Sequence, residues 1–119
     1  MEELIAKIEE IDFSNMDIDN LLDNRDQDPF DSEWTRVYQE IEAIKEEKSY
    51  TDENENYNSN IREKVFSKIY NLSGHDELAE YVSDDFGLIV DSKILEYSDT
   101  WLDKLISSYE NANIPCGDL

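Results

Sequence analysis

His75 and Cys116 are the only histidine and the only cysteine among the 119 residues, and they are the first candidates for chemistry. A cysteine or serine nucleophile needs a neighbouring base, and histidine is the usual one. No motif or spacing in this chain indicates that His75 lies beside Cys116 or beside a serine. We therefore interpret His75 as an exposed residue between two expected helices, and Cys116 as a small packing side chain beside a proline.

Metal binding is the second possibility, because acidic residues are dense. A calcium loop places oxygen ligands at positions 1, 3, 5 and 12 with glycine at position 6. The stretch DIDNLLDNRDQD supplies Asp17 and Asp19 but continues with two leucines. One cysteine and one histidine are too few for a structural zinc site, and the three glycines are too isolated to form a phosphate-binding loop. We expect no metal and no cofactor.

Adjacent carboxylates such as Asp84 and Asp85 are the third possibility, as a general acid and base. Catalytic pairs need burial and shifted pKa values, and in a chain this rich in acids adjacency alone carries little information. The sequence therefore predicts a protein that is not an enzyme.

The charge is the strongest signal in the composition. There are 31 acidic residues and 10 basic ones, which gives a formal net charge of −21. Such a chain repels nucleic acid backbones and anionic membranes and attracts basic protein surfaces. The first 33 residues contain twelve of the acids, with only Lys7 and Arg25 to oppose them. We expect a basic protein partner.

Three absences bear on the compartment. A single cysteine excludes an intramolecular disulfide and is typical of a reducing environment. No apolar run approaches the ~20 residues needed to span a bilayer, and the start MEELIAKIEEIDF lacks the features of a signal peptide. We expect a cytoplasmic protein, whose oligomeric state the sequence leaves open.

Apolar residues recur at helical spacing through most of the chain, which predicts one all-α domain of five or six helices over residues 1–119. Asp31 or Ser32 is the expected N-cap of a helix over 32–48, and Gly74 is the expected end of a helix that begins near Tyr57. Further helices are expected at the N-terminus around Leu4, Ile5, Ile8 and Ile11, after an N-cap at Asp76, around Phe86–Tyr97, and from an N-cap at Ser98 or Asp99 to Ala112.

Three segments are less well defined. The stretch 46–60 is almost free of apolar residues and predicts a mobile loop or a frayed helix end. Residues 86–90, FGLIV, fit a buried strand as well as a helix, although a lone strand would have no partner, which favours a helix. Residues 12–30 mix acids with apolar anchors and end at Pro29, which stops any helix before it. At the C-terminus, Pro115 stops the last helix and leaves Ile114 and Cys116 to pack on the core.

The C-terminal part of the chain carries three linked patterns: D-[DE]-[LI]-A-x-Y-[IV]-S-D-D-F-x-L-I, then W-L-x-x-L-x-x-x-Y, then I-P-C-G. With these patterns residues 74–117 resemble the C-terminal region of small helical immunity proteins encoded beside bacterial polymorphic and contact-dependent toxins. The matching residues are Asp76, Glu77, Leu78, Ala79, Tyr81, Val82, Ser83, Asp84, Asp85, Phe86, Leu88, Ile89, Trp101, Leu102, Leu105, Tyr109, Ile114, Pro115, Cys116 and Gly117.

This resemblance implies a noncatalytic inhibitor that binds one cognate toxin. Many such toxins are nucleases with basic substrate grooves, and an acidic domain can occupy such a groove before apolar anchors lock it in place. We expect the toxin-binding surface to combine acids with aromatic anchors, namely Asp17, Asp19, Asp23, Asp26, Asp28, Phe30, Asp31, Tyr50 and Tyr57. The alternative is a phage-type nucleic-acid mimic that inhibits a DNA-binding defence system. A generic acidic adaptor or chaperone is a third interpretation.

Overall fold

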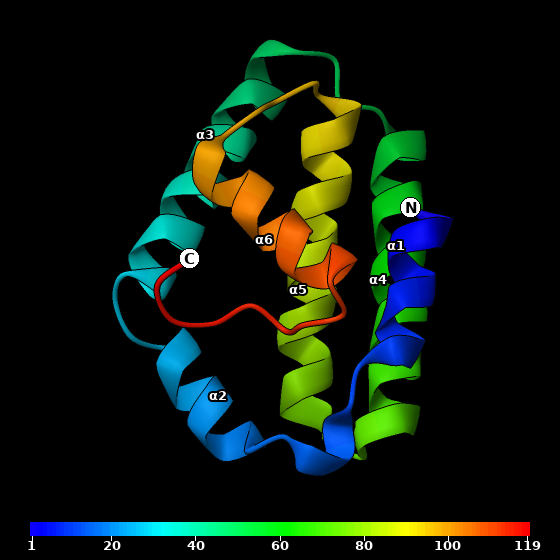
Figure 1. The fold of residues 1–119 in the computed structure, drawn as a ribbon. Coiled ribbons are helices and arrows are strands. Elements are labelled where there is room, and N and C mark those ends of the chain that lie inside the picture. Colours follow the sequence, from blue (N-terminus) through cyan, green and yellow to red (C-terminus); the bar gives the residue numbers. More distant parts are fainter.

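The chain folds into six α-helices and two short 3₁₀ turns, without a strand, in a computed structural model that describes all of residues 1–119 (Figure 1). The predicted all-α single domain is confirmed. The α-helices are α1 (Glu2–Lys7), α2 (Ile18–Arg25), α3 (Phe30–Glu47), α4 (Asp52–Ser73), α5 (Asp76–Ile94) and α6 (Thr100–Glu110), and the 3₁₀ turns cover Ile8–Glu10 and Phe13–Asn15.

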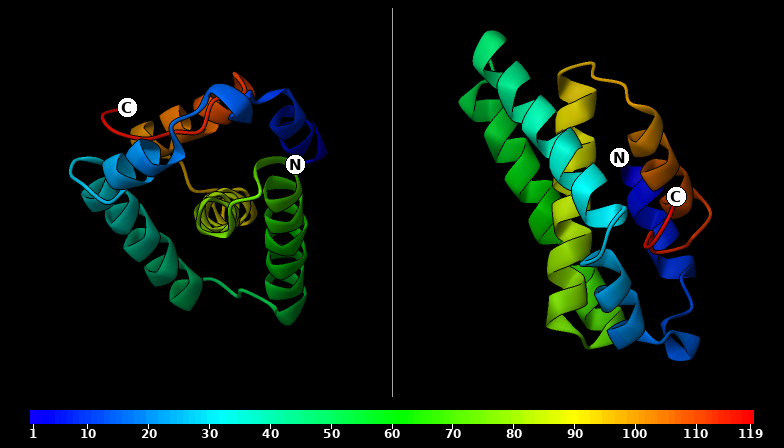
Figure 2. Two further views of the ribbon diagram at one scale, coloured as in Figure 1. Left: turned by 90° about the horizontal axis from the view of Figure 1, so that it is seen from below. Right: turned by 90° about the vertical axis from the view of Figure 1, so that its left-hand side faces the viewer.

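Helix α5 lies at the centre and the other helices surround it (Figure 2). Twelve of its 19 residues are buried, as expected of a helix that is covered on most sides. Helix α4 packs antiparallel against it, and α6 covers its other side together with α1 (Figure 1). Helices α3 and α4 diverge from α5 on the side away from α6 (Figure 2).

Two predicted helix ends are confirmed. Gly74 ends α4 in the left-handed conformation with φ of 70°, which glycine adopts without steric cost. The Asp99 carboxylate accepts a hydrogen bond from the Leu102 N–H at 3.0 Å and caps α6.

Two other predicted caps are wrong. Helix α3 begins at Phe30, earlier than expected, and the Asp28 carboxylate accepts from the Ser32 N–H at 3.2 Å. Helix α5 is capped by His75, whose Nδ1 accepts from the Leu78 N–H at 3.3 Å. His75 is therefore partly buried and in use as a cap, whereas the sequence predicted an exposed connector.

The expectation of a loop over residues 46–60 is wrong for most of that segment. Helix α3 continues to Glu47 and α4 begins at Asp52. Thr51 and Asn54 form a capping box with two reciprocal hydrogen bonds of 3.1 Å. The polar residues of the first turns are thus helix-forming, and one of them, Asn58, is buried against α5.

The two remaining uncertain segments are also resolved. Residues 86–90 lie inside the single helix α5, so the strand alternative is wrong and the two expected helices after Asp76 are one. Helix α2 occupies residues 18–25, with Asp17 as its N-cap. At the other end of the chain Ile114 and Pro115 are buried and Cys116 packs against the core.

The helices also bear on membrane insertion. None of the six combines the length and the apolar character needed to cross a membrane.

Candidate functional site

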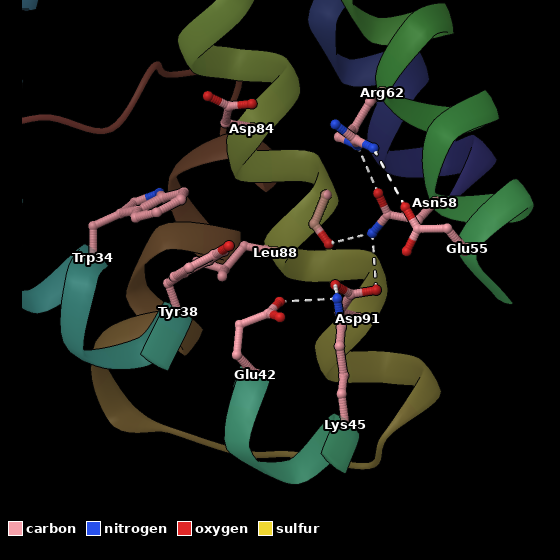
Figure 3. Close-up of a pocket in the computed structure, with 11 residues that line it drawn as sticks. Trp34, Tyr38, Glu42, Lys45, Glu55, Asn58, Arg62, Asp84, Leu88 and Asp91 are labelled. Atoms are coloured by element: carbon pink, nitrogen blue, oxygen red, sulfur yellow. Dashed lines mark hydrogen bonds and ion pairs between the residues drawn. The ribbon is translucent and has the colours of Figure 1, made fainter. Parts of the chain in front are cut away.

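Two hollows meet on the side of the molecule where α3 and α4 diverge from α5. The first has a volume of about 300 Å³ and is shown in Figure 3; its lining residues come from α3, α4 and α5, and are Trp34, Tyr38, Glu42, Lys45, Glu55, Asn58, Arg62, Asp84, Gly87, Leu88 and Asp91. The second, of about 270 Å³, is lined by Arg25, Asp26, Phe30, Asp31, Trp34, Thr35, Tyr81 and Asp84. Because Trp34 and Asp84 belong to both hollows, we treat the two as one surface and call it the α5 groove.

The α5 groove is negatively charged. Six carboxylates line it, those of Asp26, Asp31, Glu42, Glu55, Asp84 and Asp91, against the three cations Arg25, Lys45 and Arg62. Arg25 is in addition neutralised by Asp85, which lies below the surface. An open, polar and acidic groove differs from small-molecule sites, which are mainly apolar and enclose their ligand.

A buried polar cluster anchors one end of the α5 groove. Asp85 is completely buried and accepts two hydrogen bonds from the Arg25 guanidinium, at 2.7 and 2.8 Å. It also accepts from Trp34 Nε1 at 2.9 Å and from the Tyr109 hydroxyl. Arg25 donates a further bond to the Pro115 carbonyl at 3.2 Å, which ties the C-terminal segment to α2. One carboxylate therefore joins four parts of the chain.

The charge of Asp85 also acts on Tyr109. Burial raises the pKa of the Tyr109 hydroxyl well above its ordinary value, and the neighbouring Asp85 carboxylate raises this pKa further. Tyr109 consequently stays protonated at neutral pH and remains a donor to Asp85.

A second polar cluster forms the other end of the groove. Asp91 accepts from Asn58 Nδ2 at 2.8 Å and pairs with Lys45 Nζ at 2.8 Å (Figure 3). It also accepts from the Tyr50 hydroxyl at 2.5 Å. Arg62 Nε donates to Asn58 Oδ1 at 2.6 Å. These bonds tie α3 and α4 to α5 and hold both walls of the groove in place.

Gly87 lies beneath the Arg62 side chain in this second cluster. A Cβ at Gly87 would stand 2.7 Å from Arg62 Cδ, so the absence of a side chain allows Arg62 to cross the floor of the groove.

Asp84 differs from the other acids of the groove. Its carboxylate makes no hydrogen bond and no ion pair, although it lies between the two hollows. Desolvation by the groove walls raises its pKa, and the negative charge of Asp85 raises this pKa further. Trp34, which shares both hollows with Asp84, stacks on Tyr38 with ring centroids 5.5 Å apart and an interplanar angle of 15°. The middle of the groove thus contains an unpaired carboxylate and two stacked aromatic rings.

The structure brings some of the predicted site residues to the groove. Asp26 and Asp31 line it directly, and Asp26 accepts from the Tyr81 hydroxyl at 2.9 Å, which raises the pKa of Tyr81 to about 12. Phe30 lies at its base, only 2% exposed, with the Arg25 guanidinium 4.5 Å from its ring. Tyr50 contributes its hydroxyl to the Asp91 cluster.

The other predicted site residues lie outside the groove. Asp17 and Asp28 are exposed; Asp17 caps α2, and Asp28 accepts from the Ser32 N–H in the first turn of α3. Asp19 and Asp23 are exposed on α2, and Tyr57 is 46% exposed on α4.

Among the groove residues that the sequence did not assign to the binding surface are Trp34, Tyr38, Tyr81 and Asp84. Trp34 and Tyr38 fit the apolar stripe of α3, which is typical of a side that faces the core, yet Tyr38 is 45% exposed. Their spacing of four residues, which stacks two aromatic rings on one helix edge, is the signal that could have separated them from the core positions. Asp84 had no such signal.

The structure offers no group of three or more His, Cys, Asp or Glu residues arranged to hold a metal ion. Among curated proteins no match to the chain was found. A family model described as Immunity protein PIM1, in contrast, matches residues 2–116, which includes the N-terminal half that the C-terminal patterns did not cover. This family supports an immunity function with a toxin as partner. The chain therefore belongs to the Immunity protein PIM1 family.

Proposed function

We propose that this protein neutralises its cognate toxin by placing the α5 groove against a basic surface of that toxin, and that the toxin is a nuclease. The observation that carries the proposal is the collection of six carboxylates in one groove whose walls are held by buried polar clusters. A nuclease must bind phosphate charge, so its substrate groove is basic. An acidic groove of fixed shape complements such a surface.

The charge of the whole chain supports the encounter. A net charge of −21 speeds association with a cationic partner, by roughly 10 to 1,000 fold at low salt. The exposed acids Asp19 and Asp23 on α2, together with Asp26 and Asp31, extend the negative surface from the groove toward the N-terminal part of the chain. Asp17, Asp28 and Tyr57 take peripheral places in this proposal, while Phe30 and Tyr50 support the groove from within.

The family match favours a toxin as the partner over the DNA-binding defence system of the alternative interpretation. It also favours an inhibitor over an enzyme. A noncatalytic role requires only tight association, for which interfaces of about 1,600 Å² in total are usual.

The direct experiment is co-expression with the toxin domain encoded beside this protein's gene. We expect a stable complex on co-purification, rescue of growth in cells that express the toxin, and loss of nucleic acid cleavage by the purified toxin when the protein is added. The absence of both complex and rescue would refute the toxin partner. A complex with a toxin that does not cleave nucleic acid would retain the immunity function and refute the nuclease.

The electrostatic part of the proposal is tested by association kinetics. Replacement of Asp19, Asp23 and Asp31 by Asn removes three charges without touching a helix cap, so we expect slower association with a weaker dependence on salt. The matched control is Asp103→Asn with Glu110→Gln and Asp118→Asn, which removes three charges from α6 and the C-terminal segment. If both triple variants associate equally slowly, the effect is one of net charge and the docking surface lies elsewhere.

A further inference from the structure

The groove region uses one arrangement twice: a cation held between a carboxylate and an aromatic ring. The Arg25 guanidinium pairs with Asp85 at 2.7 Å and lies 4.5 Å from the centre of the Phe30 ring and 5.3 Å from that of Tyr81. Both elements of such a site attract the cation, because the face of an aromatic ring is electronegative.

The second instance is Lys45. Its ammonium group pairs with Asp91 at 2.8 Å and lies 4.4 Å from the centre of the Tyr50 ring. In both instances the chain itself supplies the cation, and the carboxylate belongs to α5.

A third carboxylate of α5, that of Asp84, has aromatic neighbours but forms no ion pair. Asp84 shares both hollows with Trp34, on which Tyr38 stacks (Figure 3). The charges of Arg62 and Arg25 lower its pKa in part, but both side chains bond to other residues: Arg25 pairs with Asp85, and Arg62 Nε donates to Asn58 Oδ1 at 2.6 Å.

We infer that Asp84, Trp34 and Tyr38 form a socket for one arginine side chain of the toxin. This inference rests on the proposed function and identifies one contact between the α5 groove and the toxin. The socket supplies what the other two sites have, a carboxylate and aromatic rings, and the partner supplies the cation.

Arginine fits this socket better than lysine. Its planar guanidinium can stack on the Trp34–Tyr38 wall while its N–H groups donate to the Asp84 carboxylate, and it is more weakly hydrated than an ammonium group. A basic nuclease surface, in addition, offers arginines that normally contact phosphate.

The socket is also held ready before binding. Trp34 donates its Nε1–H to the buried Asp85, so the indole ring is fixed from below and little freedom is lost when a partner stacks on it. The raised pKa of Asp84 agrees with a carboxylate that is partly desolvated and lies beside the negative charge of Asp85. An incoming guanidinium would supply a positive charge to this desolvated carboxylate, as expected of a residue at the centre of an interface.

The test measures the dissociation constant of the complex with the neighbouring toxin domain for two socket variants, Asp84→Asn and Tyr38→Ala. Each is expected to weaken binding by about tenfold or more, mainly through faster dissociation. Neither residue makes a hydrogen bond that holds the fold, so both variants should unfold within a few degrees of the unaltered protein. The matched controls are Asp103→Asn on α6 and Tyr70→Ala on α4, since Tyr70 is 48% exposed against 45% for Tyr38.

The partner residue is then identified by replacing, one at a time, the exposed arginines of the toxin with lysine. We expect one such replacement to weaken the complex with the unaltered protein and to have little further effect with the Asp84→Asn variant, since that contact is already lost. A tight complex in which both socket variants bind like the controls, or in which no toxin arginine is coupled to Asp84, overturns the socket and leaves the proposed function standing. The absence of any complex with the unaltered protein overturns both.

Discussion

Asp84 and Asp85 occupy successive positions on α5 and have opposite surroundings. Asp85 is buried and accepts hydrogen bonds from Arg25, Trp34 and Tyr109. Asp84 lies at the surface of the α5 groove with no partner at all and has a raised pKa. One step along a helix turns a side chain by about 100°, and here that step separates the core from the groove.

The contrast between Asp84 and Asp85 distinguishes a residue that maintains the fold from one that is free to bind a partner. A buried carboxylate with all its hydrogen bonds made is costly to disturb, because Arg25 then loses its only counterion and Trp34 and Tyr109 lose the acceptor of their hydrogen bonds. An unpaired carboxylate beside another negative charge contributes nothing to the fold and slightly opposes it. We therefore expect substitutions at the two positions to have opposite signatures in stability and in toxin binding.

The largest expected effect is that of Asp85→Asn. The Arg25 guanidinium would stay buried without its counterion, and loss of one partner of a buried pair costs about 3 to 5 kcal/mol in free energy of unfolding. Urea denaturation measures this loss, with Asp84→Asn as the control of equal charge change. A loss below about 1 kcal/mol would show that the Asp85 cluster does not hold the fold together.

Tyr109→Phe should have the next largest effect. The substitution removes only the hydroxyl that donates to Asp85, and a hydrogen bond to a charged group contributes about 1.5 to 3 kcal/mol. The same urea experiment measures it, and Tyr70→Phe, on the exposed side of α4, serves as the control. Equal stability of the two variants would mean that Asp85 is satisfied without Tyr109.

Asp99 gives a pH-dependent contrast with Asp84. Hydrogen bonds from Arg36 lower the pKa of Asp99, so its contribution to stability is present above its ordinary pKa and is lost as the pH falls through the lowered value. Asp99→Asn keeps a cap for α6 but loses the ion pair, at a cost of about 0.5 to 1 kcal/mol near neutral pH. Urea midpoints measured between pH 2 and 7, a range set by the ordinary carboxyl pKa, should show a flatter acid limb for this variant. An unchanged acid limb would assign the loss of stability to other carboxylates.

The smallest effect is expected for Asp84→Asn, and it has the opposite sign. A raised pKa means that the folded state binds the proton more tightly than the unfolded chain, so stability falls as the pH rises from the ordinary pKa of Asp to the raised one. The neutral Asn removes this penalty, and the gain at neutral pH is about 0.5 kcal/mol or less after solvent screening. Repeated thermal unfolding at pH 4 and pH 7 measures the difference. A clear loss of stability would show that Asp84 has a structural partner after all.

Much of the fold could be predicted from local patterns, because those patterns have local causes. The left-handed Gly74 and the Asp99 cap depend on residues within four positions, and both were predicted. The helix over 52–60 could not be predicted from its polar composition, because it packs through a polar residue. Asn58 is buried against α5 and donates hydrogen bonds to the Gly87 carbonyl and to Asp91.

The candidate site was harder to predict for the same reason. The excess of acids indicated a basic partner, and Asp26 and Asp31 do line the groove. The way α3 and α4 diverge from α5 decides two things. It determines whether Asp84 or Asp85 faces outward, and which side of α3 stays exposed. No pattern within one helix contains that information.

The most direct test of the α5 groove as the toxin-binding surface compares two variants of equal charge. One carries Asp31→Asn, Glu42→Gln and Asp84→Asn in the groove, and the other carries Asp103→Asn, Glu110→Gln and Asp118→Asn on α6 and the C-terminal segment. The measurement is the dissociation constant of each complex with the neighbouring toxin domain at physiological salt. If the groove is the interface, the groove variant should bind at least about 100 times more weakly and the other variant within a few fold of the unaltered protein. Equal weakening of both, or a greater effect of the α6 variant, would contradict the assignment of the groove.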